Sequence, residues 1–585
     1  ESDLYGDNNQ DNITSYFIIE GDSLEVSNST LESHAYAWSS QGHSDYDRHA
    51  EAEMIFDIDG SSIFRDSELK VQSMERSNNS GDYWRADSSM KITSSSLYSY
   101  DTNFSSYRWT RYGEESIDFD ISGHAKYEDS RIVSREFSAD YGSLDMDGTQ
   151  ITGDFKGVSG DKRYSELFDV DITSTGDFSI DNSSIYYIGG LKNLNSHFYY
   201  FTFSIDSTGD IHIANTNINS TFYRESIIHL EADEITIKDS ILRAGTETSA
   251  SGGYGNNNDD DITSRIELSG DDMILVDGST LVSFARMNST ETNSNSDRRT
   301  FSYIDIESDD LDLVDSKLLA KSDNRADTYP SDHNWGSYQS INITGSEMLV
   351  DGTDIIGYQL SFGSTVTRFD FAGDVEIRDD SWLMPAPAGS IGGDFVVRDS
   401  NLTGINNWYS DYSLDVNDTS LDMGGLGIYD SVWWYSANQD CSFSNFGKKQ
   451  CLFAKVRESV SWDVDSDSDV ILDNFTLRHS SHYSAHKYDS FRFNITTSGD
   501  IEITDSDINS DYHCGTMSNC KIYNSYSHYY NENPYRYAYF NLSGSDISIE
   551  GSDIWIEGGT ESDLYGDNNQ DNITSYFIIE GDSLE

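Results

Sequence analysis

The sequence predicts an all-β protein in which short strands coil repeatedly around one narrow core, a parallel β-solenoid. Three observations support this fold class. Apolar residues alternate with polar residues in short runs, the period of half-buried β-strands. Gly-Asp and Asp-Ser pairs, which favour turns, separate these runs. The same pattern of three runs recurs along the chain about every 33 residues, which gives about 17 coils in 560 residues and leaves almost no room for helix.

The recurring pattern is clearest in residues 491–510, which read FRFNITTSGDIEITDSDINS. Residues 201–220 align with this segment without a gap and share ten of its twenty residues. Residues 168–185 follow the same template. A coil of this size cannot bury its own apolar face, so coils must stack and share one core.

Within 491–510 the pattern predicts the position of each strand and turn. Residues 491–495 form the first run, Gly499-Asp500 the first turn, and residues 501–503 the second run. Asp505-Ser506 form the second turn, and Ile508 lies in the third run. We expect Ile, Val, Leu and Phe to face inward in ladders, and Asp, Ser, Thr and Asn to face water. A β-sandwich array would need longer strands and boundaries about every 100 residues, which the sequence does not show.

The charge of the chain narrows the choice of partners. It has 103 Asp and Glu against 37 Lys and Arg, a formal net charge of −66. Nucleic acid and anionic membrane surfaces are improbable partners, because so negative a field repels both. No apolar run approaches the ~18 residues of a membrane helix. A thin, long core with a large surface explains how so acidic a chain can fold.

The two ends of the sequence are identical. Residues 1–25 and residues 561–585 match at all 25 positions, a repeat with a period of 560 residues. We therefore interpret residues 1–560 as one complete solenoid unit and residues 561–585 as the start of the next identical unit. The alternative is a terminal duplication without an array.

The coil pattern resembles that of the right-handed parallel β-helix proteins, which include the pectin-lyase-like solenoids and repetitive microbial surface proteins. The resemblance covers most of the chain through the coil in which Gly-Asp, an alternating apolar run, Asp-Ser and a further apolar residue follow one another. It implies a right-handed solenoid, and it implies nothing specific about function.

Cysteines and glycosylation sequons point to an oxidising, extracellular setting. The pairs Cys441–Cys451 and Cys514–Cys520 could each close a short polar loop as a disulfide, although three pairings, and free thiols, are open. Covalent N-glycans are expected on some of the Asn-x-Ser/Thr sequons. The candidates are Asn12, Asn28, Asn78, Asn103, Asn182, Asn219, Asn288, Asn342, Asn401, Asn417, Asn474, Asn494, Asn541 and Asn572.

Candidate metal ligands are few. Alternating acids at Asp463, Asp465, Asp467 and Asp469 are weak calcium candidates, but Ser468 and Asn474 replace the Gly and Glu of an EF-hand loop. Residues 256–261 form a second acidic stretch. His479, His482 and His486 have a helical metal-ligand spacing in a segment that reads as loop.

A polysaccharide lyase or hydrolase is the third choice of function. Asp271-Asp272 superficially resembles the Asp pair of the pectin-hydrolysing family, which would need two carboxylates in complementary roles. Asn215-Thr216-Asn217 is the nearest match to that family's Asn-Thr-Asp element and lacks the acid, and the other elements are missing. We therefore expect no enzyme activity.

Three segments rich in aromatic residues read as loops: residues 98–112, 433–435 and 523–539. They could pack on the solenoid or bind sugars. The leading hypothesis is a structural protein that joins end to end with itself into an extracellular filament, fibre or sheath on a microbial cell. The alternative is an adhesin or carbohydrate-binding stalk that contacts surface glycans.

Overall fold

The computed structural model describes most of the chain. The described residues are 11–38, 48–76, 84–109, 113–154, 166–188, 199–222, 224–250, 261–289, 298–326, 335–359, 363–379, 381–384, 388–391, 395–398, 401–405, 409–416, 421–424, 427–431, 457–466, 469–473, 476–480, 488–511, 535–556 and 572–585.

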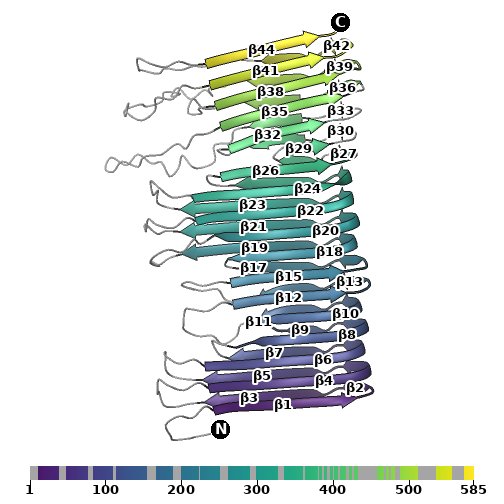
Figure 1. Cartoon of the computed structure of the whole chain (residues 1–585), viewed down its shortest axis with the longest axis vertical. Helices are drawn as coiled ribbons and strands as arrows, with labels where there is room; N and C mark the ends of the chain where they lie inside the picture. Colours follow the sequence, from purple (N-terminus) through teal and green to yellow (C-terminus); the bar gives the residue numbers. More distant parts are fainter. Residues whose placement is uncertain are drawn as a thin grey trace, which may run out of the picture.

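These residues build a column of stacked coils with two long parallel sheets and no helix among the described segments (Figure 1). The first sheet has 28 strands: β1 (Asp11–Gly21), β2 (Leu24–Ser27), β4 (Arg48–Arg65), β6 (Trp84–Tyr100), β8 (Glu115–Glu128), β10 (Glu136–Asp147), β12 (Glu166–Ser174), β13 (Phe178–Asp181), β15 (Tyr199–Ser207), β16 (Ile211–Ala214), β18 (Glu225–Lys238), β20 (Ile262–Asp277), β22 (Arg298–Val314), β24 (Trp335–Asp351), β26 (Gly363–Phe371), β27 (Val375–Arg378), β29 (Ala388–Ile391), β30 (Phe395–Arg398), β32 (Tyr409–Val416), β33 (Leu421–Gly424), β35 (Arg457–Ser466), β36 (Val470–Asp473), β38 (Tyr488–Thr497), β39 (Ile501–Thr504), β41 (Tyr535–Ser543), β42 (Asp546–Glu550), β44 (Asn572–Glu580) and β45 (Ser583–Leu584).

The second sheet has 17 strands among the described residues, one for each coil. They are β3 (Thr30–Trp38), β5 (Glu68–Arg76), β7 (Asn103–Trp109), β9 (Arg131–Val133), β11 (Gln150–Asp154), β14 (Ser184–Ile188), β17 (Asn217–Phe222), β19 (Ile241–Ala250), β21 (Thr280–Ser289), β23 (Lys317–Ala326), β25 (Asp354–Gln359), β28 (Trp382–Met384), β31 (Asn401–Ile405), β34 (Gly427–Ser431), β37 (Thr476–Ser480), β40 (Asp507–Asp511) and β43 (Asp553–Ile556). The number agrees with the predicted 17 coils.

Each coil contributes two runs to the first sheet and one to the second, as the sequence predicts. In the template coil, β38 pairs with β41, β39 with β42, and β40 with β43, all in parallel register. The turns fall at residues 499–500 and 505–506. The parallel β-solenoid prediction is therefore confirmed. No helix in the described part of the chain is long and apolar enough to cross a membrane.

The first corner of the coil, between its first and second runs, differs from the predicted Gly-Asp turn in several coils. β4, β6 and β20 each run through the corner as one strand, and their pairing register shifts there, for example between Ile58 and Ser61. Extra residues at such a bulge bend the strand without ending it. At Gly60 the N–H donates to the Asp22 carbonyl at 2.9 Å, and a Cβ would lie only 2.4 Å from that oxygen. Backbone approach of this kind requires a glycine.

The core is a continuous ladder of apolar side chains along the solenoid axis. Phe56, Phe64 and Phe104 are fully buried and contact one another edge to face, with ring centroids 5.7 and 5.5 Å apart. The Phe104 ring lies 5.4 Å from that of Phe119 in the same geometry. Burying an aromatic side chain of this size stabilises the fold by about 2–3 kcal/mol.

Many Ser and Thr side chains lie inside the solenoid, which corrects the prediction that these residue types face water. At the third corner, where a coil begins and ends, Ser106 Oγ lies 2.9 Å from Ser88 Oγ, and Ser264 Oγ lies 2.9 Å from Ser283 Oγ. All four side chains are buried. Because their hydroxyls pair with each other and with backbone carbonyls, burial leaves little of their hydrogen-bonding capacity unused.

The second turn has one backbone conformation throughout the described coils. Its first residue has a positive φ of 46–63° and is always Asn, Asp or Gly, the residue types that adopt this conformation at least cost. These residues are Asn28, Asp66, Asp101, Asp129, Gly148, Asn182, Asn215, Asp239, Gly278, Asp315, Gly352, Asp379, Asp505 and Gly551.

A ladder of hydroxyl groups connects these turns along the axis. Near each of these turns a Ser or Thr hydroxyl donates to a nearby backbone carbonyl, usually that of the residue two positions earlier. The same hydroxyl accepts a backbone N–H from the equivalent Ser or Thr of the preceding coil. Ser279 N–H donates to Ser316 Oγ at 3.0 Å, and Ser316 N–H donates to Thr353 Oγ1 at 3.0 Å. Among the described coils, the longest run of consecutive bonds is Thr149, Ser183, Thr216, Ser240, Ser279, Ser316, Thr353 and Ser381.

We expect Ser316→Ala to lower the free energy of unfolding by about 1–3 kcal/mol, because it leaves the buried Ser279 N–H without an acceptor. Ser316→Thr keeps the hydroxyl and is expected to retain most of the stability. The guanidinium midpoint and hydrogen exchange at the Ser279 amide measure the effect. Ser179→Ala, on the outward face of β13, is the control. Equal midpoints for Ser316→Ala and the control would contradict a stabilising ladder.

Candidate functional site

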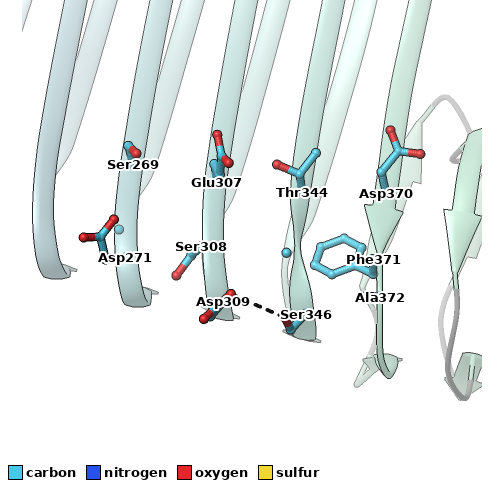
Figure 2. Close-up of a pocket in the computed structure, with 12 residues that line it drawn as sticks. Ser269, Asp271, Glu307, Ser308, Asp309, Thr344, Ser346, Asp370, Phe371 and Ala372 are labelled. Carbon is cyan, nitrogen blue, oxygen red and sulfur yellow. Dashed lines mark hydrogen bonds between the residues drawn. The ribbon is translucent and has the colours of Figure 1, made fainter.

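A shallow groove at the first corner, about 650 Å³ in volume, crosses four neighbouring coils (Figure 2). It is lined by residues from the corners of β20, β22 and β24 and from the end of β26. Its carboxylates are Asp271, Glu307, Asp309 and Asp370, and none of its lining residues is basic. The groove exists because small residues occupy the corners, including Gly345, where a Cβ would lie 2.1 Å from the Ser308 carbonyl oxygen.

The groove does not assemble the chemistry of the pectin-hydrolysing family. Asp309 accepts a long hydrogen bond from Ser346 at 3.4 Å, and Asp370 forms an ion pair with Arg368. Asp271 lies in the groove, whereas Asn215 and Thr216 lie at the second turn, a different corner of the coil. The structure therefore separates the two elements on which the resemblance to that family depended. The Thr216 hydroxyl belongs to the axial ladder.

A buried ion pair inside the N-terminal half is a polar group that sequence reasoning missed. The Glu115 carboxylate lies 3.2 Å from Arg135 Nε and accepts the Arg108 backbone N–H at 3.2 Å. Both side chains of the pair are at least 95% buried. Glu115 alternates in step with the core residues Ile117 and Phe119 along β8. The period-two pattern of the sequence therefore already indicated that its side chain faces inward.

Burial changes the titration of this carboxylate. Loss of water raises the pKa of Glu115 from 4.5 to about 7, and the opposing charges of Arg135 and Arg108 offset only part of the effect. Burial is also the largest cause of raised pKa values at other described carboxyl groups. These are Glu53, Asp118, Glu136, Asp169, Glu225 and Asp312.

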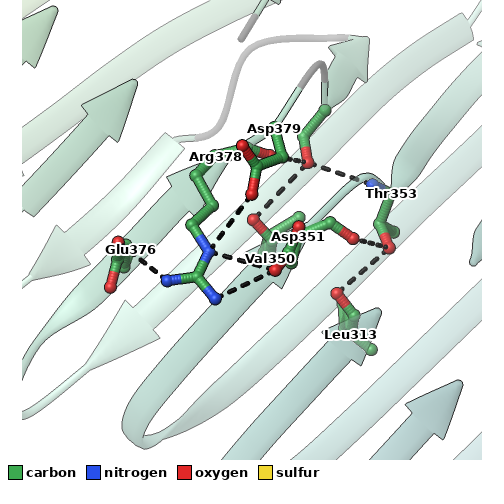
Figure 3. A network of polar contacts seen from close by, with 8 residues as sticks. Leu313, Val350, Asp351, Thr353, Glu376, Arg378 and Asp379 are labelled. Carbon is green, nitrogen blue, oxygen red and sulfur yellow. Dashed lines mark hydrogen bonds and ion pairs between the residues drawn. The ribbon is translucent and has the colours of Figure 1, made fainter. Parts of the chain in front are cut away.

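Basic side chains on the outer surface bridge acids of neighbouring coils. Arg378 binds Asp351 of the preceding coil through Nη2 at 2.9 Å and Nε at 3.0 Å, and its Nη1 lies 3.4 Å from Glu376 (Figure 3). Asp351 holds the pKa of Arg378 above its usual value, chiefly through this hydrogen bond. In the same region Thr353 Oγ1 donates to the Leu313 and Asp351 carbonyls. Ion pairs of this kind offset repulsion between stacked acids.

Among the residues that the structure describes, no group of three or more His, Cys, Asp or Glu is placed to hold a metal ion. The predicted metal ligands within this part of the chain are therefore not brought together. Asp463 and Asp465 lie in β35 and Asp469 precedes β36, where its carboxylate accepts the Asp500 N–H at 2.8 Å. Asp467, His482, His486 and residues 256–260 lie outside the described residues. His479 lies in β37.

The sequons occupy different positions in the coil, and glycosylation itself stays a prediction. Asn28 and Asn182 are exposed at second turns. Asn541 Nδ2 donates to Asn494 Oδ1 at 2.8 Å, and Asn342 Nδ2 donates to Asp305, so these amides connect neighbouring coils. Asn12, Asn103, Asn219, Asn288, Asn401 and Asn572 lie in strands, and Asn78, Asn417 and Asn474 lie outside the described residues, as do Cys441, Cys451, Cys514 and Cys520.

Part of the predicted aromatic loops is strand. Residues 98–100 end β6 and residues 107–109 end β7, while Tyr537 and Tyr539 lie in β41. Period-two alternation continues through these residues, which is the signal that the loop interpretation overlooked. Residues 110–112, 433–435 and 523–534 lie outside the described residues.

Several outer aromatic rings in the described part of the chain pack on one another and on arginines. Phe301 and Tyr338 stack at 5.1 Å, with Arg299 5.3 Å from the Phe301 ring centroid. Tyr537 and Tyr539 stack at 6.0 Å, and Arg492 lies 5.2 Å from the Tyr539 centroid. These contacts support the packing interpretation for the described rings, because neighbouring side chains already cover part of each face.

The fold and these surface features define an acidic parallel β-solenoid. Comparison with known proteins finds no family model, no curated protein and no solved structure that matches this chain.

The folded state holds the Glu115 proton more tightly than the unfolded chain does. The stability that this group contributes is therefore complete below its unfolded pKa near 4.5 and is lost as pH rises through about 7. We expect the free energy of unfolding to fall between pH 5 and 8, by up to about 3 kcal/mol from this residue.

Glu115→Gln should flatten that loss, as measured by denaturant unfolding across the pH range. Glu114→Gln removes the same charge from a side chain that is 71% exposed and is the matched control. Parallel pH profiles for Glu115→Gln and the wild type would show that the buried carboxyl group does not titrate in this range.

Proposed function

We propose that this chain is a structural, extracellular protein whose solenoid forms the rod of a filament, fibre or sheath on a microbial cell. The observation that carries the proposal is the stack itself. In the described part of the chain each coil pairs with the next through both sheets, and one apolar cluster includes residues from Val26 to Ile547. A single rigid column of this kind transmits load along its axis through backbone hydrogen bonds.

Three further features support a load-bearing rod. The hydroxyl ladder adds side-chain hydrogen bonds along the axis at a corner where sheet pairing alone would leave N–H groups buried. Ion pairs between coils, such as Arg378–Asp351 and Lys317–Asp354, counter the repulsion of stacked carboxylates. The remaining negative charge keeps a long rod hydrated and apart from like-charged neighbours.

The groove in Figure 2 fits this role as a surface feature of the corners. It is open and acidic, and its carboxylates lie in successive coils. A general acid and base pair requires two carboxyl groups held in distinct environments. In the groove the carboxylates lie at equivalent corner positions of neighbouring coils, and this geometry gives no specific support to a catalytic role.

Native material should therefore appear in electron micrographs as continuous fibres with an axial repeat of about 80 Å, since 17 coils at ~4.8 Å each span that length. A denaturing gel of the same material reports whether units are joined covalently. Separate short rods that bind sugar saturably and competably on a glycan array would instead favour the adhesin.

A further inference from the structure

We infer that the strands β44 and β45 of the duplicated segment form the joint between units, and that their partner is a second copy of the unit stacked in the register of an ordinary coil. The inference rests on the proposed function and adds the contacts of the joint. It applies whether the next unit belongs to the same polypeptide or to another, because the duplicated segment would pair in the same way in both cases.

The two copies of the segment use opposite edges of the same strand. β1 pairs with the coil that follows it, Asn12 opposite His49, whereas β44 pairs with the coil that precedes it, Asn572 opposite Tyr535. The offset is 37 residues in both cases, since 49 − 12 = 37 and 572 − 535 = 37. Superimposing the copies therefore inserts one strand between β41 and β4, with both of its edges paired.

The hydrogen bonds at the first corner show the same complementarity. In the second copy, Asp582 N–H donates to the Ser545 carbonyl of the preceding coil at 2.7 Å. In the first copy, the equivalent residue Asp22 accepts the Gly60 N–H of the following coil through its carbonyl at 2.9 Å. One aspartate at a joint can make both bonds, because one uses its N–H and the other its carbonyl oxygen.

Core packing at the joint is also shared between the copies. Phe577 stacks on Phe540 with centroids 4.9 Å apart, yet it is 53% exposed on its other side. Its equivalent, Phe17, packs against Phe56 of the following coil at 6.2 Å and is only partly buried. A second copy stacked beyond Phe577 would therefore cover the exposed ring with its Phe56, the residue that packs against Phe17. The same copy would cover Leu584, which is 59% exposed.

The outer face of the joint has a matching tyrosine cluster. Tyr576 lies 6.0 Å from Tyr537 and 6.2 Å from Tyr539, measured between ring centroids. Its equivalent Tyr16 is 59% exposed at the other end of the unit. The joint therefore brings Tyr16 of one unit beside Tyr537 and Tyr539 of the unit before it, and this cluster recurs once in each unit.

A two-unit chain tests the inference. In this chain the sequence from residue 26 to residue 585 follows Glu585 directly, so one copy of the duplicated segment lies between two complete units. Negative-stain microscopy and the maximum dimension from small-angle scattering should show one straight rod about twice as long as the ~80 Å rod of the single-unit chain. Two rods meeting at variable angles would overturn the joint.

Phe577→Asp in the middle copy removes core packing only at the joint. We expect it to convert the straight rod into two rods with a flexible connection and to shorten the mean end-to-end length by at least a fifth. Thr574→Asp, on the outward face of the same strand, should leave the rod straight. If Phe577→Asp leaves the rod as straight as the control does, the joint is not held by this packing.

The controls separate failure of the joint from failure of the proposed function. A single-unit chain that forms an ~80 Å rod, together with a two-unit chain that is hinged, contradicts the joint while leaving a structural role for separate rods. A single-unit chain that forms no rod contradicts both.

Discussion

Pairing of each coil with the coils before and after it is the constraint on which the rest of this structure depends. In a solenoid the backbone N–H and C=O groups point along the axis, so each must find its partner in an adjacent coil. The turns therefore have to repeat as faithfully as the strands do. The positive-φ residue of the second turn and the hydroxyl group close to it meet this requirement in the described coils.

This constraint also explains how a chain with a net charge of −66 can fold. The core is only as wide as one coil, so roughly every second strand residue can be polar without loss of packing. Stacking places like charges in neighbouring coils, and basic residues such as Arg378 and Arg265 lie between them. Where an acid lies inside, as at Glu115, burial raises its pKa, so mild acid stabilises the folded state.

The same reasoning links the fold to its proposed role. The last coil of a solenoid exposes unpaired strand edges, because each coil is built to pair with another on both sides. Such an open edge favours association with another copy. In the proposed joint, the duplicated strand would pair on one side as β1 does with β4 and on the other as β44 does with β41.

The sequence by itself determined most of the strands, the second turn and the number of coils, because period-two alternation and turn-forming pairs act locally. Residues 491–510 fold as their pattern predicts. The groove at Asp271 and Glu307, the ion pair of Glu115 with Arg135, and the burial of Ser88 and Ser106 were decided only by tertiary structure. Their positions depend on which residues face each other across a corner or between coils, and insertions of unequal length between coils hide that register from a reading along the chain.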